Sequence, residues 1–154
     1  MFNSIAAHYD FLNHFLSLNI DKLWRKKAIR SARLEKKGLN ILDLACGTGD
    51  IYKMIFKQYP YQNIVGADFS LNMMKKAHKK IKNAQLVGSD IYKPSFKYKV
   101  FDRIITAFGF RNFPDKLQAL KNMYDLLKDE GLLCILELSK PENKFFGFFL
   151  TTTL

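Results

Sequence analysis

The chain of 154 residues has only two cysteines, four prolines and eight glycines, and it has no long hydrophobic run. Cys46 and Cys134 lie far apart in apolar surroundings, which predicts two reduced thiols of a cytoplasmic protein rather than a disulfide or a metal site. No apolar stretch approaches the ~20 residues that cross a bilayer. The N-terminus lacks a basic region followed by an apolar region, so we expect no secretory signal.

Acidic residues are also scarce, because 14 Asp and Glu stand against 25 Lys and Arg, a formal net charge of +11. Between Lys22 and Lys37, Glu35 is the only acid among eight basic residues. Such a segment is either the solvated face of a helix or a surface attracted to an anionic membrane or nucleic acid, and charge alone favours the first. A general basic bias is favoured over one dedicated patch by scattered lysines: Lys75, Lys76, Lys79, Lys80, Lys97 and Lys99.

Apolar spacing alternates between short strands and helices from residue 39 onward. The expected strands are 39–45, 63–67, 85–87, 101–108 and 132–138, and the expected helices are 50–59, 71–81 and 114–128, preceded by two helices. Near-continuous apolar strands that alternate with helices predict an α/β fold, a doubly wound parallel sheet of five strands. No repeat or linker divides the chain, so we expect one domain, with N-terminal helices in 1–37 and a core in 38–154.

Local signals predict where the helices begin and end. Gly38 ends the second N-terminal helix, and Ser70 caps the helix 71–81. Pro114 suits the first turn of the next helix, and Gly131 stops it. The core stripe of that helix is expected at Leu117, Leu120, Met123, Tyr124 and Leu127.

The stretch Leu42–Asp50 reads LDLACGTGD and places a Gly-Thr-Gly turn at 47–49, directly after an apolar strand. The glycines let the backbone approach a ligand closely, and the following helix presents free N–H groups. A dinucleotide fingerprint needs a third glycine where this chain has Tyr52, which disfavours a dehydrogenase. Asp50 would repel a phosphate and suits a ligand with sulfonium and ammonium groups, such as S-adenosylmethionine.

Acids follow the next two predicted strands. Asp68 comes nineteen positions after Gly49, where a carboxylate can accept both ribose hydroxyls of an adenosine. Asp90 follows the third strand and is placed to meet the adenine edge. One acid after one strand is a common turn residue, but two such acids together with the glycine turn favour adenosyl-group binding.

Several segments resemble the ubiquinone/menaquinone biosynthesis C-methyltransferase family, which includes demethylmenaquinone methyltransferase. The matching segments cover essentially the whole chain in order: MFNSIAAHYDFLNHFLSLNIDKLWRKKAI, LDLACGTGD, GADFS, TAFGFRNFPDKLQALKNMYDLLKDEG and ELSKP. The glycine loop alone indicates only a class I methyltransferase. The segments YDFLN and AFGFRN, with the tryptophan in the basic stretch, are the specific part.

The resemblance implies a class I methyltransferase Rossmann-like fold, S-adenosyl-L-methionine as the cofactor and methylation of a prenylated quinol. The substrate is a naphthoquinol (demethylmenaquinol to menaquinol) or a benzoquinol. The cofactor-binding residues carried over from the glycine loop and the strand ends are Asp43, Ala45, Gly47, Thr48, Gly49, Asp68, Phe69, Asp90, Ile91 and Ala107. Ala107 stands where the family often has serine.

Arg111 and Asn112 match the family's Arg-Asn step at the mouth of the substrate pocket. Methyl transfer to a phenol carbon needs the ring held in line with the sulfonium methyl and a stabilised oxyanion, a role for Arg111. A general base is also needed, and His8, Tyr9 and Asp10 are the candidates. The alternative is that Tyr9 belongs to the core and that His8 is an exposed helix residue. No metal is expected.

A polyprenyl substrate resides in the membrane, which favours peripheral contact of Lys22–Lys37 with anionic lipid at the inner face of the membrane. We expect no nucleic-acid partner. Family members typically continue past ELSKP with a helical segment and two antiparallel strands. Without them, the strand 132–138 is an open edge, and homo-oligomers could form through it or through a cluster of Phe145, Phe146, Phe148 and Phe149.

Other functions remain as alternatives. A nucleic-acid N-methyltransferase usually has an Asn/Asp-Pro-Pro-aromatic loop where this chain reads AFGFRNF, and Cys134, which lies inside a predicted strand, is poorly placed for cytosine chemistry. A methyltransferase for RNA or another small molecule nevertheless stays open. So does a catalytically impaired S-adenosylmethionine-binding remnant or scaffold subunit.

Overall fold

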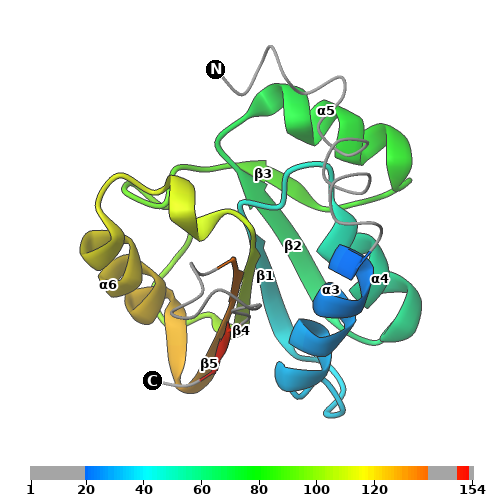
Figure 1. The fold of residues 1–154 in the computed structure, drawn as a ribbon, viewed down its shortest axis with the longest axis horizontal. Helices are drawn as coiled ribbons and strands as arrows, with labels where there is room; N and C mark the ends of the chain where they lie inside the picture. The colour runs from blue at the N-terminus through cyan, green and yellow to red at the C-terminus, as the bar shows by residue number, and fades with distance from the viewer. Residues whose placement is uncertain (1–19, 139–148, 153–154) are drawn as a thin grey trace, which may run out of the picture.

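The computed structural model describes residues 20–138 and 149–152. Its centre is a sheet in the order β3-β2-β1-β4-β5-β6 (Figure 1). The strands are β1 (Asn40–Leu44), β2 (Asn63–Asp68), β3 (Leu86–Gly88), β4 (Phe101–Ala107), β5 (Leu127–Glu137) and β6 (Phe149–Thr152). The helical elements are α3 (Ile20–Ser31), α4 (Asp50–Gln58), α5 (Leu71–Lys80), the short 3₁₀ helix η1 (Phe110–Asn112) and α6 (Lys116–Leu126).

The five strands β1 to β5 form a doubly wound parallel sheet, as predicted. β1 pairs in parallel with β2 on one side and with β4 on the other, and β3 and β5 extend the two sides. The chain runs from β1 outward to β3 and then crosses over β1 to β4, so the strand order reverses beside β1. In such sheets a ligand binds at the carboxyl ends of the strands next to this reversal.

The open edge predicted for strand 132–138 is wrong. β6 pairs with β5 in antiparallel orientation, and the register joins Cys134 to Thr152 and Glu137 to Phe149. β6 thereby satisfies hydrogen-bonding groups at the carboxyl end of β5. The carboxyl-terminal part of β5, Cys134 to Glu137, is therefore not an open edge. The side chains of the phenylalanine cluster lie outside the described residues.

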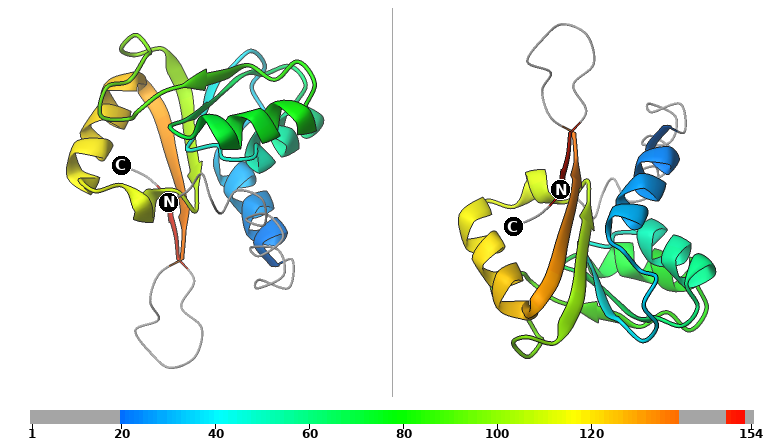
Figure 2. Two further views of the ribbon diagram at one scale, coloured as in Figure 1. Left: turned by 90° about the horizontal axis from the view of Figure 1, so that it is seen from above. Right: turned by 90° about the horizontal axis from the view of Figure 1, so that it is seen from below.

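Helices cover both faces of the sheet in two layers (Figures 1 and 2). α3, α4 and α5 lie on one face, where Ile29 of α3 and Ile55 of α4 are fully buried in one apolar cluster. α6 covers the other face and contributes Ala119, Met123 and Leu126 to a second cluster. The sheet thus separates two dry cores.

The second N-terminal helix ends earlier than predicted, at Ser31 rather than near Gly38. Arg33 adopts a left-handed conformation with φ 52°, which turns the chain out of the helix axis. Leu34 can then bury its side chain completely in the first core. The gain from burying this leucine explains why the basic segment does not continue as helix.

The core stripe predicted for α6 is wrong in part. Leu117 and Tyr124 are 64% and 73% exposed, whereas Met123 is fully buried. The sequence offers two apolar stripes at helical spacing, and packing against the sheet selects the one that contains Ala119, Met123 and Leu126. Leu127 is buried as predicted, but as the first residue of β5.

Gly131 does not terminate a helix. α6 ends at Leu126, and β5 begins at the next residue. The register of β4 against β5 shifts between the pair Phe101–Leu127 and the pair Arg103–Leu132. Gly131 lies inside this irregular part of β5, so the predicted helix stop is a strand bulge.

Candidate active site

A cavity of about 790 Å³ lies at the carboxyl edge of the parallel sheet. The loops that follow β1, β2, β3 and β4 all contribute to its wall, as the fold predicts. Predicted site residues in this wall are Ala45, Gly47, Thr48, Asp68, Phe69, Asp90, Ile91, Ala107 and Asn112. The topology has therefore gathered residues from four separate loops around one space.

The glycine turn after β1 uses its two glycines for different reasons. Gly47 has φ +54°, and a Cβ there would meet no atom within 4 Å, so this position is open toward the cavity but conformationally restricted. Gly49 has φ +82°, and a Cβ there would lie 2.9 Å from Cδ1 of Ile81. Gly49 therefore allows the first turn of α4 to pack closely, and it does not line the cavity.

Asp68 links the glycine turn to the loop after β2. Its Oδ2 accepts a hydrogen bond of 2.7 Å from the Gly47 N–H, and its Oδ1 accepts one of 2.7 Å from the Ser70 N–H. Burial raises the pKa of Asp68, and these two backbone hydrogen bonds oppose the rise. Each carboxylate oxygen has a further lone pair, so the same group can accept two hydroxyls from a ligand.

The loops after β2 and β3 complete this half of the cavity. The carboxylate of Asp90 accepts a hydrogen bond of 2.9 Å from the Tyr92 N–H, which fixes its orientation. Ile91 is buried, and its carbonyl accepts a hydrogen bond of 2.8 Å from the side chain of Asn122 in α6. Phe69 is 81% exposed and offers a flat apolar surface at the cavity wall.

Asp43 is not brought to the cavity wall. It is 1% exposed, and its Oδ2 accepts a hydrogen bond of 3.0 Å from the Tyr52 N–H in α4. Burial is the main reason why the pKa of Asp43 is raised to about 7. The predicted cofactor contact is therefore a structural one, since Asp43 ties β1 to the helix behind the glycine turn.

The Arg-Asn step lies in η1, and the structure separates its two members. Asn112 lines the cavity, whereas Arg111 does not. The Arg111 guanidinium lies 2.5 Å from Oε1 of Glu137, and its backbone N–H donates to Oε2 of the same carboxylate at 2.9 Å. Arg111 is thus held at the end of β5, beside the cavity. The candidate bases His8, Tyr9 and Asp10 lie outside the described residues.

Sequence reasoning missed Arg25 and misjudged the surroundings of Asp50. Both residues line the cavity, and Asp50 pairs with Arg25 and with Lys80 of α5. The acid expected to attract a cationic ligand therefore already has two cationic partners. A signal for Arg25 does exist in the sequence, because it shares a helical face with Ala28 and Ile29, both fully buried.

The sequence profile of the ubiE/COQ5 methyltransferase family matches residues 1–151. The chain belongs to this family. Membership confirms two expectations from the sequence: the protein is a methyltransferase, and its cofactor is S-adenosylmethionine.

Individual relatives agree with this membership. The chain is 38% identical to the demethylmenaquinone methyltransferase of Thermotoga maritima, and the match covers 99% of this chain and 68% of that protein. It is 37% identical to the ubiquinone/menaquinone biosynthesis C-methyltransferase UbiE of Pseudoalteromonas translucida, covering all of this chain and 66% of the relative. The chain therefore spans about two thirds of the length of these family members.

A solved structure shows the same fold. A Methanococcus maripaludis protein assigned as an S-adenosylmethionine-dependent methyltransferase superimposes with a TM-score of 0.75 at 22% identity. The match covers 88% of this chain and 63% of that one. The fold is thus the class I methyltransferase fold that the sequence predicted.

The described residues of this ubiE/COQ5 family member fit the cofactor. Asp68 presents two acceptor oxygens to the cavity, as a ribose diol requires. The open position above Gly47 lets a ligand approach the backbone, and Phe69 and Ile91 supply apolar surface for a purine ring. Of the predicted cofactor residues, only Asp43 and Gly49 support the site from behind.

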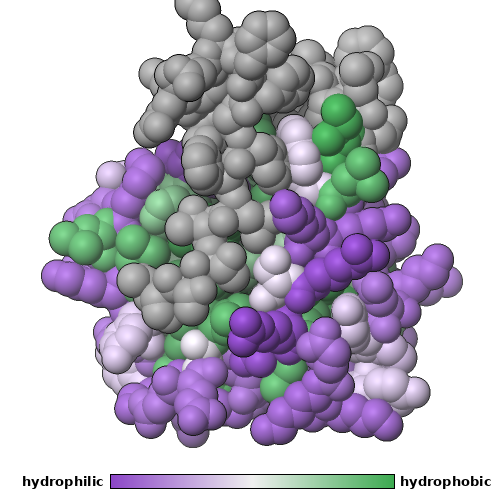
Figure 3. Space-filling view, turned by 60° about the horizontal axis from the view of Figure 1, so that its bottom comes forward, coloured by the Kyte–Doolittle hydropathy of each residue, from purple (hydrophilic) through white to green (hydrophobic). Residues whose placement is uncertain are grey.

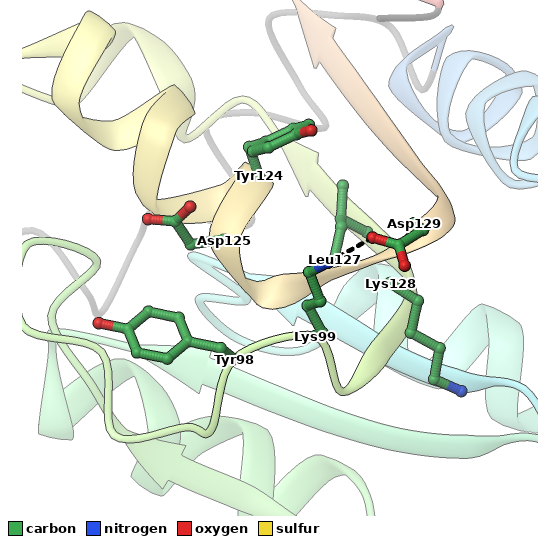
Figure 4. Close-up of a pocket in the computed structure, with 7 residues that line it drawn as sticks. All are labelled: Tyr98, Lys99, Tyr124, Asp125, Leu127, Lys128 and Asp129. Carbon is green, nitrogen blue, oxygen red and sulfur yellow. Dashed lines mark hydrogen bonds and ion pairs between the residues drawn. The ribbon is translucent and has the colours of Figure 1, made fainter.

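A second, smaller cavity of about 320 Å³ lies at the opposite edge of the sheet, between the segment before β4 and the turn from α6 to β5 (Figure 4). Tyr98 and Tyr124 stand at its rim, and both are largely exposed. Lys99 and Asp129 also line it and pair with each other at 2.5 Å. This cavity contains none of the predicted site residues and lies away from the strand ends where the fold places ligands.

Proposed function

We propose that the chain transfers the methyl group of S-adenosylmethionine to a ring carbon of a prenylated quinol and converts demethylmenaquinol to menaquinol in quinone biosynthesis. The observation that carries the proposal is the cradle of Asp68 and Gly47 at the carboxyl edge of the sheet. The names of the relatives, demethylmenaquinone methyltransferase and UbiE, supply the substrate class.

The bound cofactor supplies an electrophilic methyl group. The chain itself must hold the quinol ring in line with that methyl, exclude water and stabilise the oxyanion of the neighbouring hydroxyl. Asn112 and Phe113 line the cavity beside the strand-four loop and are suited to contact the ring. Because Glu137 compensates part of the Arg111 charge, we assign the direct contact to Asn112 and a more distant electrostatic role to Arg111.

Proton removal from the quinol hydroxyl needs a base, and His8 and Tyr9 remain the proposed candidates. In this proposal residues 1–37 form the substrate side of the enzyme, and residues 38–154 form the cofactor-binding core. A single protonation-dependent step would give a pH–rate profile that one of these side chains controls. The variants His8→Gln and Tyr9→Phe distinguish the two candidates. Only replacement of the true base should lower kcat while cofactor binding stays intact.

Two measurements test the proposal. Calorimetric titration with S-adenosylhomocysteine should show binding that Asp68→Asn weakens, whereas Asp102→Asn, at the opposite end of the sheet, leaves it unchanged. A methyl-transfer assay with reduced demethylmenaquinone in detergent should then give the methylated product. Binding without transfer would favour a remnant or scaffold role, and methylation of RNA instead would overturn the substrate assignment.

We further propose that α3 contacts an anionic membrane at the cytoplasmic face, where the quinol resides. Lys22, Lys26 and Lys27 are exposed on α3, and Leu23 between them is 62% exposed. Such a surface combines attraction to anionic lipid with an apolar side chain that can enter the interface. Within residues 20–138, no helix is both long enough and apolar enough to cross a bilayer.

A further inference from the structure

Arg25 is a cation of α3 that lies in the wall of the cofactor cavity instead of on the exposed basic surface. The residue is only 9% exposed, although its neighbours Lys22 and Lys26 are exposed. The carbon at the centre of its guanidinium lies 5.0 Å from the centroid of the Phe108 ring. This contact fixes the plane of the group beside the loop that follows β4.

Two acids hold Arg25 in this position. Its Nε lies 3.4 Å from Oδ2 of Asp21, one helical turn earlier, and its Nη2 lies 3.6 Å from Oδ2 of Asp50 at the start of α4. Asp50 also pairs with Lys80. A buried ion pair contributes little net stability, because desolvation offsets the attraction between the charges. The cluster therefore calls for an explanation beyond folding.

The charges of this cluster match those of an amino acid. Within residues 20–138, this cluster sets Arg25 and Lys80 against Asp21 and Asp50. A ligand that carries one carboxylate and one ammonium adds no net charge to it. The two residues of the cluster that line the cavity, Arg25 and Asp50, share its wall with Gly47 and Thr48.

We propose that Arg25 binds the α-carboxylate of S-adenosylmethionine and selects ligands that possess it. This inference rests on the proposed function, since it concerns the same cofactor. A guanidinium donates charge-assisted hydrogen bonds to a carboxylate, and its orientation is already set by Asp21 and Phe108. The basic segment of α3 thus has two roles, because Arg25 faces the cofactor and the exposed lysines face outward.

The test compares two ligands that differ in the carboxylate alone. S-adenosylhomocysteine carries both charges of the amino acid, whereas S-adenosyl-3-thiopropylamine keeps the ammonium and lacks the carboxylate. Calorimetry on the unmodified chain should give a Kd for the amine that is about tenfold or more higher, as expected for losing hydrogen bonds to a charged group.

The variant Arg25→Gln should raise the Kd of S-adenosylhomocysteine by a similar factor. It should change the Kd of the amine by no more than about twofold. Arg25→Lys should recover part of the discrimination, because it restores the charge without the planar fork. Arg30→Gln is the matched control, since it removes an exposed arginine of the same helix and should change neither Kd.

The outcomes separate the inference from the proposed function. If the unmodified chain binds neither ligand, the proposed function itself fails. If it binds both ligands equally, or if Arg25→Gln weakens both by the same factor, Arg25 has only a structural role and the inference is overturned. The inference is supported if Arg25→Gln binds the amine as tightly as the unmodified chain does but no longer prefers S-adenosylhomocysteine.

Discussion

The two helical layers of the sheet have similar cores and different surfaces. The segment 20–82, which forms α3, α4 and α5, contains fifteen Lys and Arg against five Asp and Glu. The segment 83–138, which forms α6 and the strands near it, contains eight Lys and Arg against seven Asp and Glu. In Figure 3, hydrophilic side chains cover most of the half that carries α3 and α4. Almost the entire net charge therefore belongs to one layer.

This difference corrects the interpretation of the lysines as a general bias. Lys75, Lys76 and Lys79 lie far from Lys22–Lys37 in the sequence, but α5 and α3 belong to the same layer. Lys97 and Lys99 are the part of the scattered set that lies elsewhere. A one-sided charge distribution creates a directional field, which can orient the molecule toward an anionic surface.

The largest expected effect tests whether the two cores are equivalent. Ile29→Ala and Met123→Ala each remove a fully buried side chain, one from each layer, and each should lower the free energy of unfolding by about 2–5 kcal/mol. Urea denaturation measures this change. Leu117→Ala is the control, because this exposed leucine should cost about 0.5 kcal/mol or less. A negligible cost at Ile29 alone would show that α3 is not part of the core.

The next prediction concerns the surfaces. Replacing Lys22, Lys26 and Lys27 together by glutamine should weaken binding to anionic vesicles by about 3 kcal/mol, at ~1 kcal/mol for each charge near the surface. The matched triple on the other layer, Lys97, Lys116 and Lys121, should have little effect. Co-sedimentation at low and high salt measures both.

Equal losses from the two triples would contradict an oriented membrane contact. Loss of binding to RNA rather than to vesicles would instead favour a nucleic-acid partner.

A smaller effect should appear in the pH dependence of stability, where Asp43 and Asp102 differ in sign. Burial raises the pKa of Asp43 to about 7, so the native state binds more protons than the unfolded one between about pH 4 and pH 7. The stability from this group is present below that window and is lost as pH rises through it. Asp43→Asn should remove this slope, measured as Tm against pH.

Asp102 has the opposite shift. Burial alone would raise its pKa, but hydrogen bonds from Lys128 and from the Asn40 N–H outweigh this and lower it. Its stabilisation is therefore present above about pH 4 and is lost as pH falls further. Asp102→Asn should lower Tm at pH 7, and near pH 3 its Tm should approach that of the unmodified chain. The same pH response from both variants would contradict the assigned difference.

The smallest effect is expected in the second cavity. Lys99 and Asp129 are paired, but their side chains are 64% and 82% exposed. Solvent screening and the cost of ordering two long side chains leave little net stabilisation. Asp129→Asn should therefore leave Tm unchanged in differential scanning calorimetry, and a clear drop would indicate that this pair organises the turn from α6 to β5.

The features predictable from sequence are those that neighbouring residues determine. Ser70 caps α5 as predicted, since its hydroxyl accepts a hydrogen bond from the Met73 N–H. Asp68 and Asp90 reach the cavity because the carboxyl ends of parallel strands share one edge. These assignments need only the strand–helix alternation and the local residue types.

The predictions from sequence are wrong where contacts between distant segments determine which side chains are buried or paired. Which stripe of α6 faces inward depends on how the helix packs against the sheet, so Tyr124 is exposed although its spacing fits a core. Arg25 was counted with the surface cations because only the folded chain brings Asp50 and Phe108 beside it. The pairing of β6 with β5 likewise joins segments whose apolar pattern alone does not identify partners.

The central place of β1 has a consequence for protein synthesis. One side of β1 pairs with β2, and the other side pairs with β4. The Asn40 N–H of β1 donates to the Asp102 carboxylate of β4, which lies 62 positions later in the sequence. A nascent chain that ends before residue 101 has the glycine turn but lacks one wall of the cavity. High contact order of this kind slows folding and exposes the intermediate to aggregation. Cofactor binding can therefore stabilise the fold only after β4 and the loop that follows it have been synthesised.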